Sequence, residues 1–170
     1  AAEVAGYGRI VAVDLNPNRL EIASRLGATH TLQLTGKEEK DEVAEKIRDL
    51  TDGGVNYALD TTGNPHALRS AFDALRPLGV AGLIGGSTPG TEVKIDMLSM
   101  LAGKQVRGVI QGDSVIQTFI PTMIDLYKQG RFPFDSLITY YDGGLEDLNK
   151  ACADATDASG AVVKPVLRLC

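Results

Sequence analysis

The sequence predicts an α/β fold built on a doubly wound parallel sheet. Short apolar runs alternate with segments of helical periodicity through most of the chain. This alternation favours parallel strands joined by right-handed helical crossovers. With 170 residues, of which 44% are hydrophobic and 23% charged, the chain is long enough for one globular domain, alone or with a small appendage.

The elements follow one another in a regular order. Residues 9–14 are predicted as the first strand, and Asn16 and Pro17 then provide a helix N-cap and first helical position, with Gly27 ending the helix. Residues 91–95 alternate like an edge strand, and Pro121 is expected to kink the helix around it or to mark its first turn. Further strands are predicted at 30–34, 55–60, 80–84, 104–110, 137–141 and 162–169, and further helices at 43–50, 65–75, after Asp96, at 115–129 and around 145–152.

The first strand ends in a lone acidic residue, Asp14. The second strand of a dinucleotide-binding βαβ unit ends in this way, with its carboxylate directed at the adenosine ribose. Such a carboxylate accepts hydrogen bonds from vicinal hydroxyls and repels a 2′-phosphate, which favours NAD over NADP. Arg19, one helical turn further on, is placed to brace the same ribose. The alternatives are that Asp14 only begins a loop and that Arg19 is an ordinary surface arginine.

The upstream half of such a unit does not occur in the sequence. Its first strand and its G-x-G-x-x-G turn should precede residue 9, but Gly6-Tyr7-Gly8 precedes a strand instead of following one. The predicted fold is therefore a Rossmann-like doubly wound sheet that lacks its first strand and glycine-rich turn. Because the missing strand is central, we expect upstream residues, another segment, or direct pairing of strands 9–14 and 55–60 to satisfy the backbone on both sides.

The ends of the later strands provide the other candidate binding features. The segment Thr61-Thr62-Gly63 follows Asp60 at a strand end and is expected to line a cofactor crevice. Gly85-Gly86 allows a flat ring to approach the backbone closely, unless it is a simple tight turn. Cys152, on the apolar side of a predicted helix, is interpreted as core packing.

Composition excludes several classes of function. A net charge of -5 without a basic cluster argues against a nucleic-acid surface. No apolar run is long enough for a membrane span, and the first residues lack a signal-peptide pattern. The cysteines, only 2 in number, indicate a cytoplasmic setting. The residues themselves provide neither a catalytic centre nor a metal site, since His30 and His66 have no ligands at suitable spacing.

Several short motifs occur in an order typical of one enzyme family. The sequence resembles the coenzyme-binding half of medium-chain, zinc-dependent alcohol dehydrogenases over essentially its whole length, and its tail is most similar to the aryl- or benzyl-alcohol branch. The motifs are IVAVD with Arg19, LGATH at 26–30, TDGGVN at 51–56, TGNP at 62–65, GK at 103–104, VRG at 106–108, FIP at 119–121, LY at 126–127, GRFPFD at 130–135 and VKP at 163–165.

The resemblance implies a set of cofactor-binding positions. They are Asp14 and Arg19 at the adenosine ribose, Thr61 and Thr62 at the adenine and ribose, Ile84, Gly86 and the backbone of Val109 and Gln111 around the nicotinamide, and Lys164 near the pyrophosphate. It further implies NAD as cofactor, hydride transfer with a small alcohol or aldehyde, and a homo-oligomer. The zinc ligands of the family lie in an N-terminal domain that this chain does not contain, so we expect no zinc binding and no turnover by the chain alone.

The resemblance also divides the chain into an incomplete NAD-binding Rossmann domain, residues 1–133, and a C-terminal segment of the catalytic domain, residues 134–170. Two alternatives remain open. One is an S-adenosylmethionine-binding methyltransferase-like domain, whose second strand also ends in a ribose-binding acid. A methyltransferase would end in an antiparallel hairpin, which the tail does not resemble. The other alternative is a non-catalytic binding or oligomerisation module.

Overall fold

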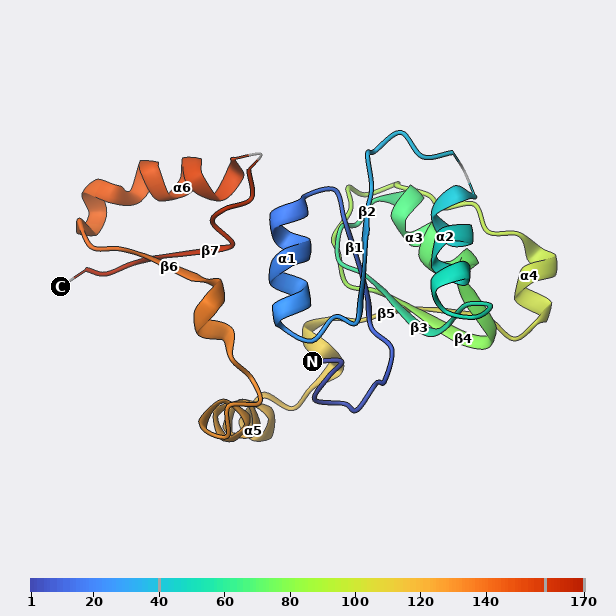
Figure 1. Ribbon diagram of the computed structural model, residues 1–170, viewed down its shortest axis with the longest axis horizontal. Coiled ribbons are helices and arrows are strands. Elements are labelled where there is room, and N and C mark those ends of the chain that lie inside the picture. The colour runs from blue at the N-terminus through green and yellow to red at the C-terminus, as the bar shows by residue number, and fades with distance from the viewer. Residues whose placement is uncertain (40, 158, 170) are drawn as a thin grey trace. The chain divides into compact units, whose positions relative to one another are not determined.

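The computed structural model describes residues 1–39, 41–157 and 159–169 (Figure 1). The chain forms two compact units. The first consists of Ala1–Gly36 and Ile116–Cys170, and the second of Lys37–Val115. No helix among the described residues combines the length and the apolar character needed to cross a bilayer.

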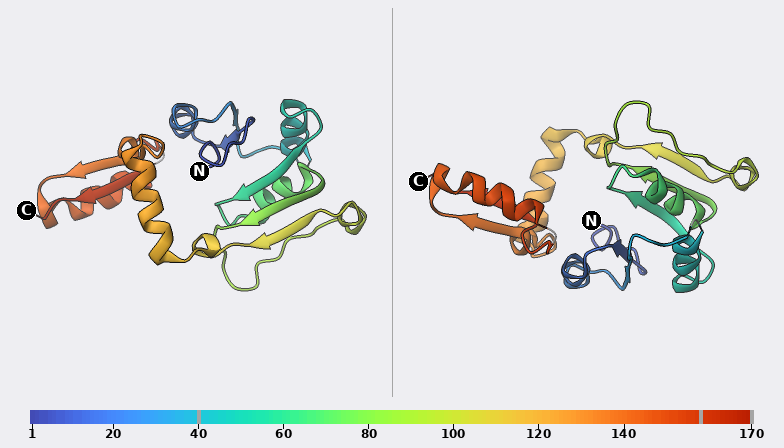
Figure 2. Two further views of the ribbon diagram at one scale, coloured as in Figure 1. Left: turned by 90° about the horizontal axis from the view of Figure 1, so that it is seen from below. Right: turned by 90° about the horizontal axis from the view of Figure 1, so that it is seen from above.

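The second unit is a parallel sheet with helices packed against it. The strands are adjacent in the order β3-β4-β5, and α3 packs against β3 and β4 on one face of the sheet (Figure 2). The elements are α2 (Glu42–Leu50), β3 (Val55–Asp60), α3 (Pro65–Asp73), β4 (Leu75–Leu83), α4 (Met97–Leu101), β5 (Gln105–Gly108) and the short 3-10 turn η1 (Gln111–Asp113).

The core of this unit lies between α3 and the sheet. Phe72 is fully buried and packs with Leu75 and Ala81, and Leu68 on the same side of α3 is also buried. Burying these apolar side chains favours folding by roughly 2 kcal/mol for each large one. α3 begins where the sequence predicts, because Pro65 occupies its first turn and the Asn64 side chain accepts the His66 N–H at 2.8 Å.

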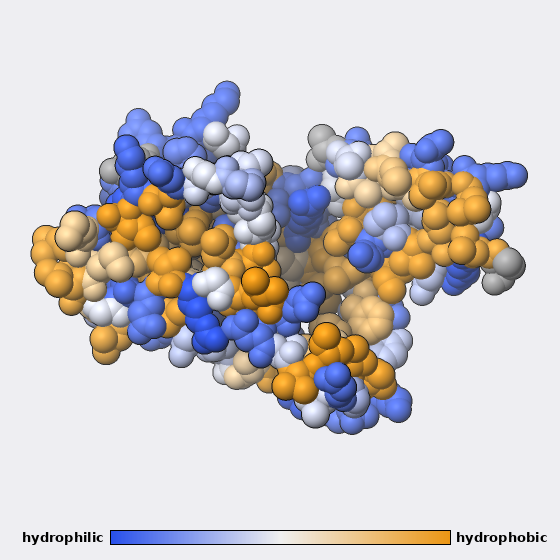
Figure 3. All heavy atoms as spheres, turned by 180° about the vertical axis from the view of Figure 1, so that it is seen from behind, coloured by the Kyte–Doolittle hydropathy of each residue, from blue (hydrophilic) through white to orange (hydrophobic). Residues whose placement is uncertain are grey.

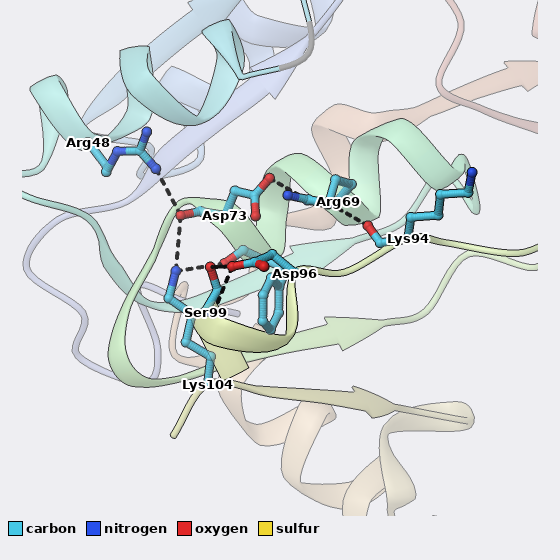
Figure 4. Close-up of polar contacts among 8 residues, drawn as sticks. Arg48, Arg69, Asp73, Lys94, Asp96, Ser99 and Lys104 are labelled. Atoms are coloured by element: carbon cyan, nitrogen blue, oxygen red, sulfur yellow. Dashed lines mark hydrogen bonds and ion pairs between the residues drawn. The ribbon is translucent and has the colours of Figure 1, made fainter. Parts of the chain in front are cut away.

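The C-terminal end of α3 is closed by two basic side chains, one from α2 and one from the residue before β5 (Figure 4). Arg48 of α2 donates to the Asp73 carbonyl at 3.0 Å, and Lys104 donates to the same carbonyl at 3.3 Å. The Lys104 ammonium also lies 5.3 Å from the centre of the Phe72 ring. Cations at this end satisfy orphan carbonyls and complement the helix dipole, so α3 is fixed firmly against the sheet.

The N-terminal part of the first unit is a βαβ element. β1 (Val11–Asp14) and β2 (His30–Gln33) pair in parallel register and are joined by α1 (Pro17–Arg25), whose Leu20 is buried. The Asn16 side chain accepts the N–H groups of Asn18 and Arg19, so the predicted N-cap is confirmed. Gly27 follows the helix with a φ of 101°, as its predicted role in ending the helix requires.

The C-terminal part of the first unit contains a second parallel pair, β6 with β7, bridged by α6. Tyr141 at the end of β6 is buried, and its hydroxyl donates to the Asp154 carboxylate at 2.8 Å. The elements are α5 (Ile116–Lys128), η2 (Phe134–Leu137), β6 (Ile138–Tyr141), η3 (Gly144–Asp147), α6 (Leu148–Thr156) and β7 (Lys164–Leu167).

The predicted α/β class with parallel strands is confirmed, but the ladders fall into three sheets, β1-β2, β3-β4-β5 and β6-β7. A complete doubly wound sheet has its strands in the order 3-2-1-4-5-6, so removal of its first strand would separate strands 3-2 from strands 4-5-6. The sheets β2-β1 and β3-β4-β5 of this chain correspond to these two parts. Since β1 and β3 belong to different sheets, they are not paired with each other among the described strands.

Several local predictions were wrong. The strand expected at 80–84 begins at Leu75, because Leu75 pairs with Val55 before a register shift in which Leu78 adopts a φ of 65°. Residues 91–95 form no strand. The helix continues on both sides of Pro121, which excludes one of the two predicted roles of this residue, that of marking the first turn, and leaves the predicted kink as the other. Cys152 is exposed, because the other side of α6, with buried Ala151, faces the strands.

Candidate functional site

The carboxyl ends of the three parallel strands of the second unit define a common edge. Asp60 pairs with Leu83 and Leu83 with Gly108, so the strands end level with one another. The ladder extends one residue further: Ile84 N–H donates to the Asp60 carbonyl at 2.9 Å and Val109 N–H to the Leu83 carbonyl at 2.9 Å. The segments that begin at 61, 84 and 109 therefore leave the sheet side by side, where ligands of open α/β sheets bind.

The turn after β3 is organised by the Asp60 carboxylate. Asp60 is only 4% exposed. Its Oδ1 accepts the Thr62 N–H at 2.9 Å and the Thr62 hydroxyl at 2.7 Å, and its Oδ2 accepts the Gly63 N–H at 3.1 Å. The Thr62 hydroxyl in turn accepts the Asn64 N–H at 3.0 Å. Thr61 and Thr62, both predicted as site residues, are thus exposed on a turn whose backbone donors at 62, 63 and 64 are all bonded.

Two glycines let the turns after β3 and β4 touch. Gly63 has a φ of 69°, and a Cβ there would overlap the Gly86 carbonyl. A Cβ at Gly85 would overlap the backbone of Thr62 and Gly63. The Ser87 hydroxyl donates to the Gly63 carbonyl. The contact leaves no room for side chains and leaves Ile84 and Gly86, two more predicted site residues, exposed beside it.

The segment after β5 turns sharply at the remaining predicted positions of this unit. Val109 is half-buried, and Gln111 is exposed with a φ of 50°. The Gln111 carbonyl accepts the Ser114 hydroxyl at 3.0 Å. Arg107 forms an ion pair with Asp113 at 2.8 Å, which ties the end of β5 to this turn.

Asp14 lies at the carboxyl end of β1 in the first unit and is half-buried. Its Oδ1 accepts the Asn16 N–H at 2.8 Å, which orients the carboxylate at the start of α1. Arg19 is exposed on the first turn of α1, so both side chains belong to one βα junction. Next to this junction, a hollow of about 310 Å³ lies between α1 and β2, lined by Pro17, Leu20, Glu21, Ser24, Thr31 and Gln33.

Lys164, the last predicted position, is the first residue of β7 and is exposed. Its Cα partner across the ladder is Ile138. It belongs to the first unit together with Asp14 and Arg19. The structure therefore brings Thr61, Thr62, Ile84, Gly86, Val109 and Gln111 to one edge of the second unit, and it places Asp14, Arg19 and Lys164 in the first.

The sequence did not predict that Asp60 and Ser87 hold the turns at this edge together. From sequence, Asp60 is only the end of a strand, although an acid directly before Thr-Thr-Gly-Asn is well placed to accept the N–H groups of the turn that follows. Ser87 had no comparable signal, because its partner, the Gly63 carbonyl, is 24 residues away in sequence.

Two further features of the structure bear on metal and cofactor binding. No group of three or more His, Cys, Asp or Glu residues is arranged to hold a metal ion in the described part of the chain. These residues therefore do not fit the zinc of the family. An apolar hollow of about 200 Å³ in the first unit presents no polar side chain except the Tyr127 hydroxyl; it is lined by Ile120, Met123, Ile124, Tyr127, Phe132 and Phe134. This lining does not provide the polar groups that a dinucleotide requires.

Comparison with known proteins identifies the class to which this fold and edge belong. The family model described as zinc-binding dehydrogenase matches residues 1–129. The chain belongs to this family of zinc-binding dehydrogenases, which confirms the resemblance seen in the sequence.

Individual relatives are similar over the whole chain. Geraniol dehydrogenase of Castellaniella defragrans is 35% identical over 167 residues, which is 98% of this chain and 43% of that protein. A crystal structure of an alcohol dehydrogenase zinc-binding domain protein from Burkholderia ambifaria is 45% identical with a TM-score of 0.90, covering 100% of this chain and 44% of that one. Benzyl alcohol dehydrogenase from Acinetobacter calcoaceticus has a TM-score of 0.90 at 37% identity, covering 100% and 45%. The chain thus spans less than half the length of these relatives.

Proposed function

We propose that this chain is the NAD-binding portion of a zinc-dependent oxidoreductase that transfers a hydride between NAD and a small alcohol or aldehyde. The observation that supports this most directly is the level carboxyl edge of β3, β4 and β5, where the exposed turn residues named above leave the sheet together. Membership of the zinc-binding dehydrogenase family supplies the reaction class. An aryl alcohol is the proposed substrate, because a benzyl alcohol dehydrogenase is 37% identical over the full chain.

In this proposal the bound nicotinamide supplies the hydride acceptor or donor, and the chain binds and orients the dinucleotide. Asp14 accepts hydrogen bonds from the adenosine ribose hydroxyls, with Arg19 beside them. Its carboxylate is already oriented by the Asn16 N–H, so little conformational freedom is lost when a ribose binds. Thr61 and Thr62 border the adenine and ribose, Ile84, Gly86, Val109 and Gln111 border the nicotinamide, and Lys164 neutralises pyrophosphate charge.

The close approach of the glycines supports this assignment. A side chain at Gly85 would overlap the turn after β3, but a Cβ at Gly86 would meet no atom within 4 Å, so the backbone at Gly86 is open to a flat ring. The described residues provide no group of ligands for the zinc. The residues that bind and activate the alcohol are therefore proposed to lie in other parts of the whole enzyme. The division into residues 1–133 and 134–170 and a cytoplasmic location are parts of the same proposal.

Self-association through the second unit is also proposed. The expected edge at residues 91–95 is not a strand, but β5 is the last strand of its sheet and its four residues are exposed. Next to it in sequence, α4 exposes Met97 by 82%, Leu98 by 74% and Leu101 by 83%. Figure 3 shows hydrophobic side chains gathered at the left of the view, over α4. Burying such a surface against a second copy would be favourable.

The methyltransferase alternative is not favoured. β6 and β7 are parallel, whereas that class requires an antiparallel hairpin at the end of the chain. The experiment that decides is titration of the chain with NADH, NADPH and S-adenosylmethionine by calorimetry. We expect NADH to bind most tightly and NADPH about a hundredfold more weakly, because the Asp14 carboxylate repels a 2′-phosphate.

The matched variants are Asp14→Asn and Asp14→Ala. Asn keeps an oxygen for the Asn16 N–H but removes the charge, so it should lose the discrimination against NADPH while the turn at α1 stays intact. Equal affinity of the unaltered chain for NADH and NADPH would contradict the assignment of Asp14, and binding of S-adenosylmethionine alone would contradict the proposed function.

A further inference from the structure

The Asp60 carboxylate is buried directly beneath exposed residues of the proposed binding edge. It is 4% exposed and lies directly behind the exposed turn at Thr61 and Thr62. No basic side chain forms a salt bridge with it among the described residues. Its bonds to the Thr62 N–H, the Thr62 hydroxyl and the Gly63 N–H take the place of a counter-ion. A buried charge is tolerated only with such bonds, and here every one of them is made to the same turn.

These bonds connect three segments into one structure. Through the Thr62 hydroxyl, Asp60 is linked to the Asn64 N–H, and Asn64 caps α3 through the His66 N–H. Through its backbone carbonyl, Asp60 accepts the N–H groups of Ile84 and Gly85 at 2.9 and 3.1 Å. The turn after β3, the start of α3 and the turn after β4 therefore meet at one residue.

The same bonds determine what the edge can bind. A phosphate site at a helix N-terminus needs free backbone N–H groups. Here the N–H groups of Thr62, Gly63, Asn64 and His66 are already bonded to oxygens of the turn, and Pro65 has none. With a buried carboxylate directly behind it, the start of α3 favours an uncharged part of a ligand.

We propose that Asp60 is a positioning residue: its buried carboxylate holds the turn at Thr61–Gly63 against the turn at Gly85–Ser87 and so forms in advance the wall against which an uncharged part of the dinucleotide binds. Asp60 itself does not contact the ligand, because its oxygens face the turn's backbone. The inference rests on the proposed function for the identity of the ligand, but the ordering of the turn is independent of it.

The experiment measures both the turn and the ligand. Amide hydrogen exchange by NMR at Thr62, Gly63 and Asn64 reports the order of the turn, and calorimetric titration with NADH reports binding. In Asp60→Ala we expect exchange at these amides to be at least about tenfold faster and NADH affinity about 10- to 100-fold weaker. Exchange in β1 and β2 of the first unit should not change.

Asp60→Asn separates positioning from a general loss of structure. Its amide oxygen can still accept from Thr62, but its NH₂ group cannot accept the Gly63 N–H. We expect exchange at Thr62 to recover towards the unaltered rate while exchange at Gly63 stays fast, with NADH affinity between those of the unaltered chain and Asp60→Ala. A general loss of structure would instead accelerate exchange at all these amides and across the buried residues of α3.

The control is Asp96→Asn. Asp96 accepts the Ser99 N–H at the start of α4, so this variant removes a capping carboxylate of the same unit without touching the Asp60 turn. It should leave exchange at Gly63 and NADH affinity unchanged. Unaltered exchange at Thr62 and Gly63 in Asp60→Ala, or a loosened turn with undiminished NADH affinity, overturns the inference. If the unaltered chain binds no NADH, the proposed function and the ligand half of the inference are refuted, while the exchange data still decide whether Asp60 orders the turn.

Discussion

Replacing Gly63 by alanine tests the close approach of the two turns at the carboxyl edge. Gly63 has a φ of 69°, in the left-handed region that costs an L-residue about 1–2 kcal/mol. A Cβ would also overlap the Gly86 carbonyl, which is backbone and cannot rotate away. The turn after β4 would have to move and lose the bond from Ser87, worth about 1 kcal/mol. We expect Gly63→Ala to lower the free energy of unfolding by about 2–3 kcal/mol in total.

Gly86→Ala is the matched control for this substitution. No atom lies within 4 Å of a Cβ at Gly86, and its φ is not positive. This variant should therefore unfold within about 0.5 kcal/mol of the unaltered chain. Because Gly86 is proposed to border the nicotinamide, the same variant should weaken NADH binding. The two glycines thus separate stability from binding.

The assay is urea unfolding followed by far-ultraviolet circular dichroism, with the NADH dissociation constant measured in parallel. A Gly63→Ala chain as stable as the unaltered one would refute the argument, because it would mean that the turns do not touch as described. A large stability loss in Gly86→Ala would refute it equally, since the space beside that residue would then not be open.

Three further predictions concern pH, assembly and metal. The Ser99 N–H and hydroxyl hold the pKa of Asp96 below its ordinary 3.8, so the contribution of this carboxylate to stability is present above about pH 4 and lost as the pH falls through the lowered value. The difference in free energy of unfolding between the unaltered chain and Asp96→Asn, measured with urea, should therefore shift in favour of the variant from pH 6 to pH 3. A constant difference would contradict this prediction. The chain should self-associate at micromolar concentration in ultracentrifugation, and Leu101→Lys should weaken association more than Lys128→Leu on α5; a monomer throughout would count against the proposed surface. The chain should not oxidise benzyl alcohol with added NAD and zinc, and zinc-dependent turnover would show a metal centre that the described residues do not provide.

Local sequence signals predicted the local structure well. Asn16-Pro17 and Asn64-Pro65 begin helices because their side-chain caps and fixed proline φ act within one turn of chain. The family resemblance extended the prediction from local elements to the class of fold and the protein family. The errors arose where partners distant in sequence decide the outcome. Residues 91–95 alternate in polarity but contact α3 instead of a strand, since the Lys94 carbonyl accepts from Arg69 and Ile95 packs against the Phe72 cluster. The helix near Cys152 turns its smaller Ala151 towards the strands.

The candidate site shows the same difference between local sequence signals, which predict structure, and contacts between distant residues, which do not. Thr61 and Gly86 could be placed from sequence, because each follows a predicted parallel strand and such strands end on one side, whereas Ile84 and Val109 were placed by the family resemblance. The contacts that join these segments could not be predicted from sequence. They depend on glycine backbones that touch and on the Asp60 carboxylate, which faces its own turn instead of a ligand. Asp14 and Asp60 both end a parallel strand, but their surroundings differ. Asp14 is half-buried and has one oxygen bonded to its own turn, whereas Asp60 is buried with both oxygens bonded. We therefore expect an acid at a strand end to bind a ribose, as proposed for Asp14, only where the bonds of its own turn do not occupy both of its oxygens.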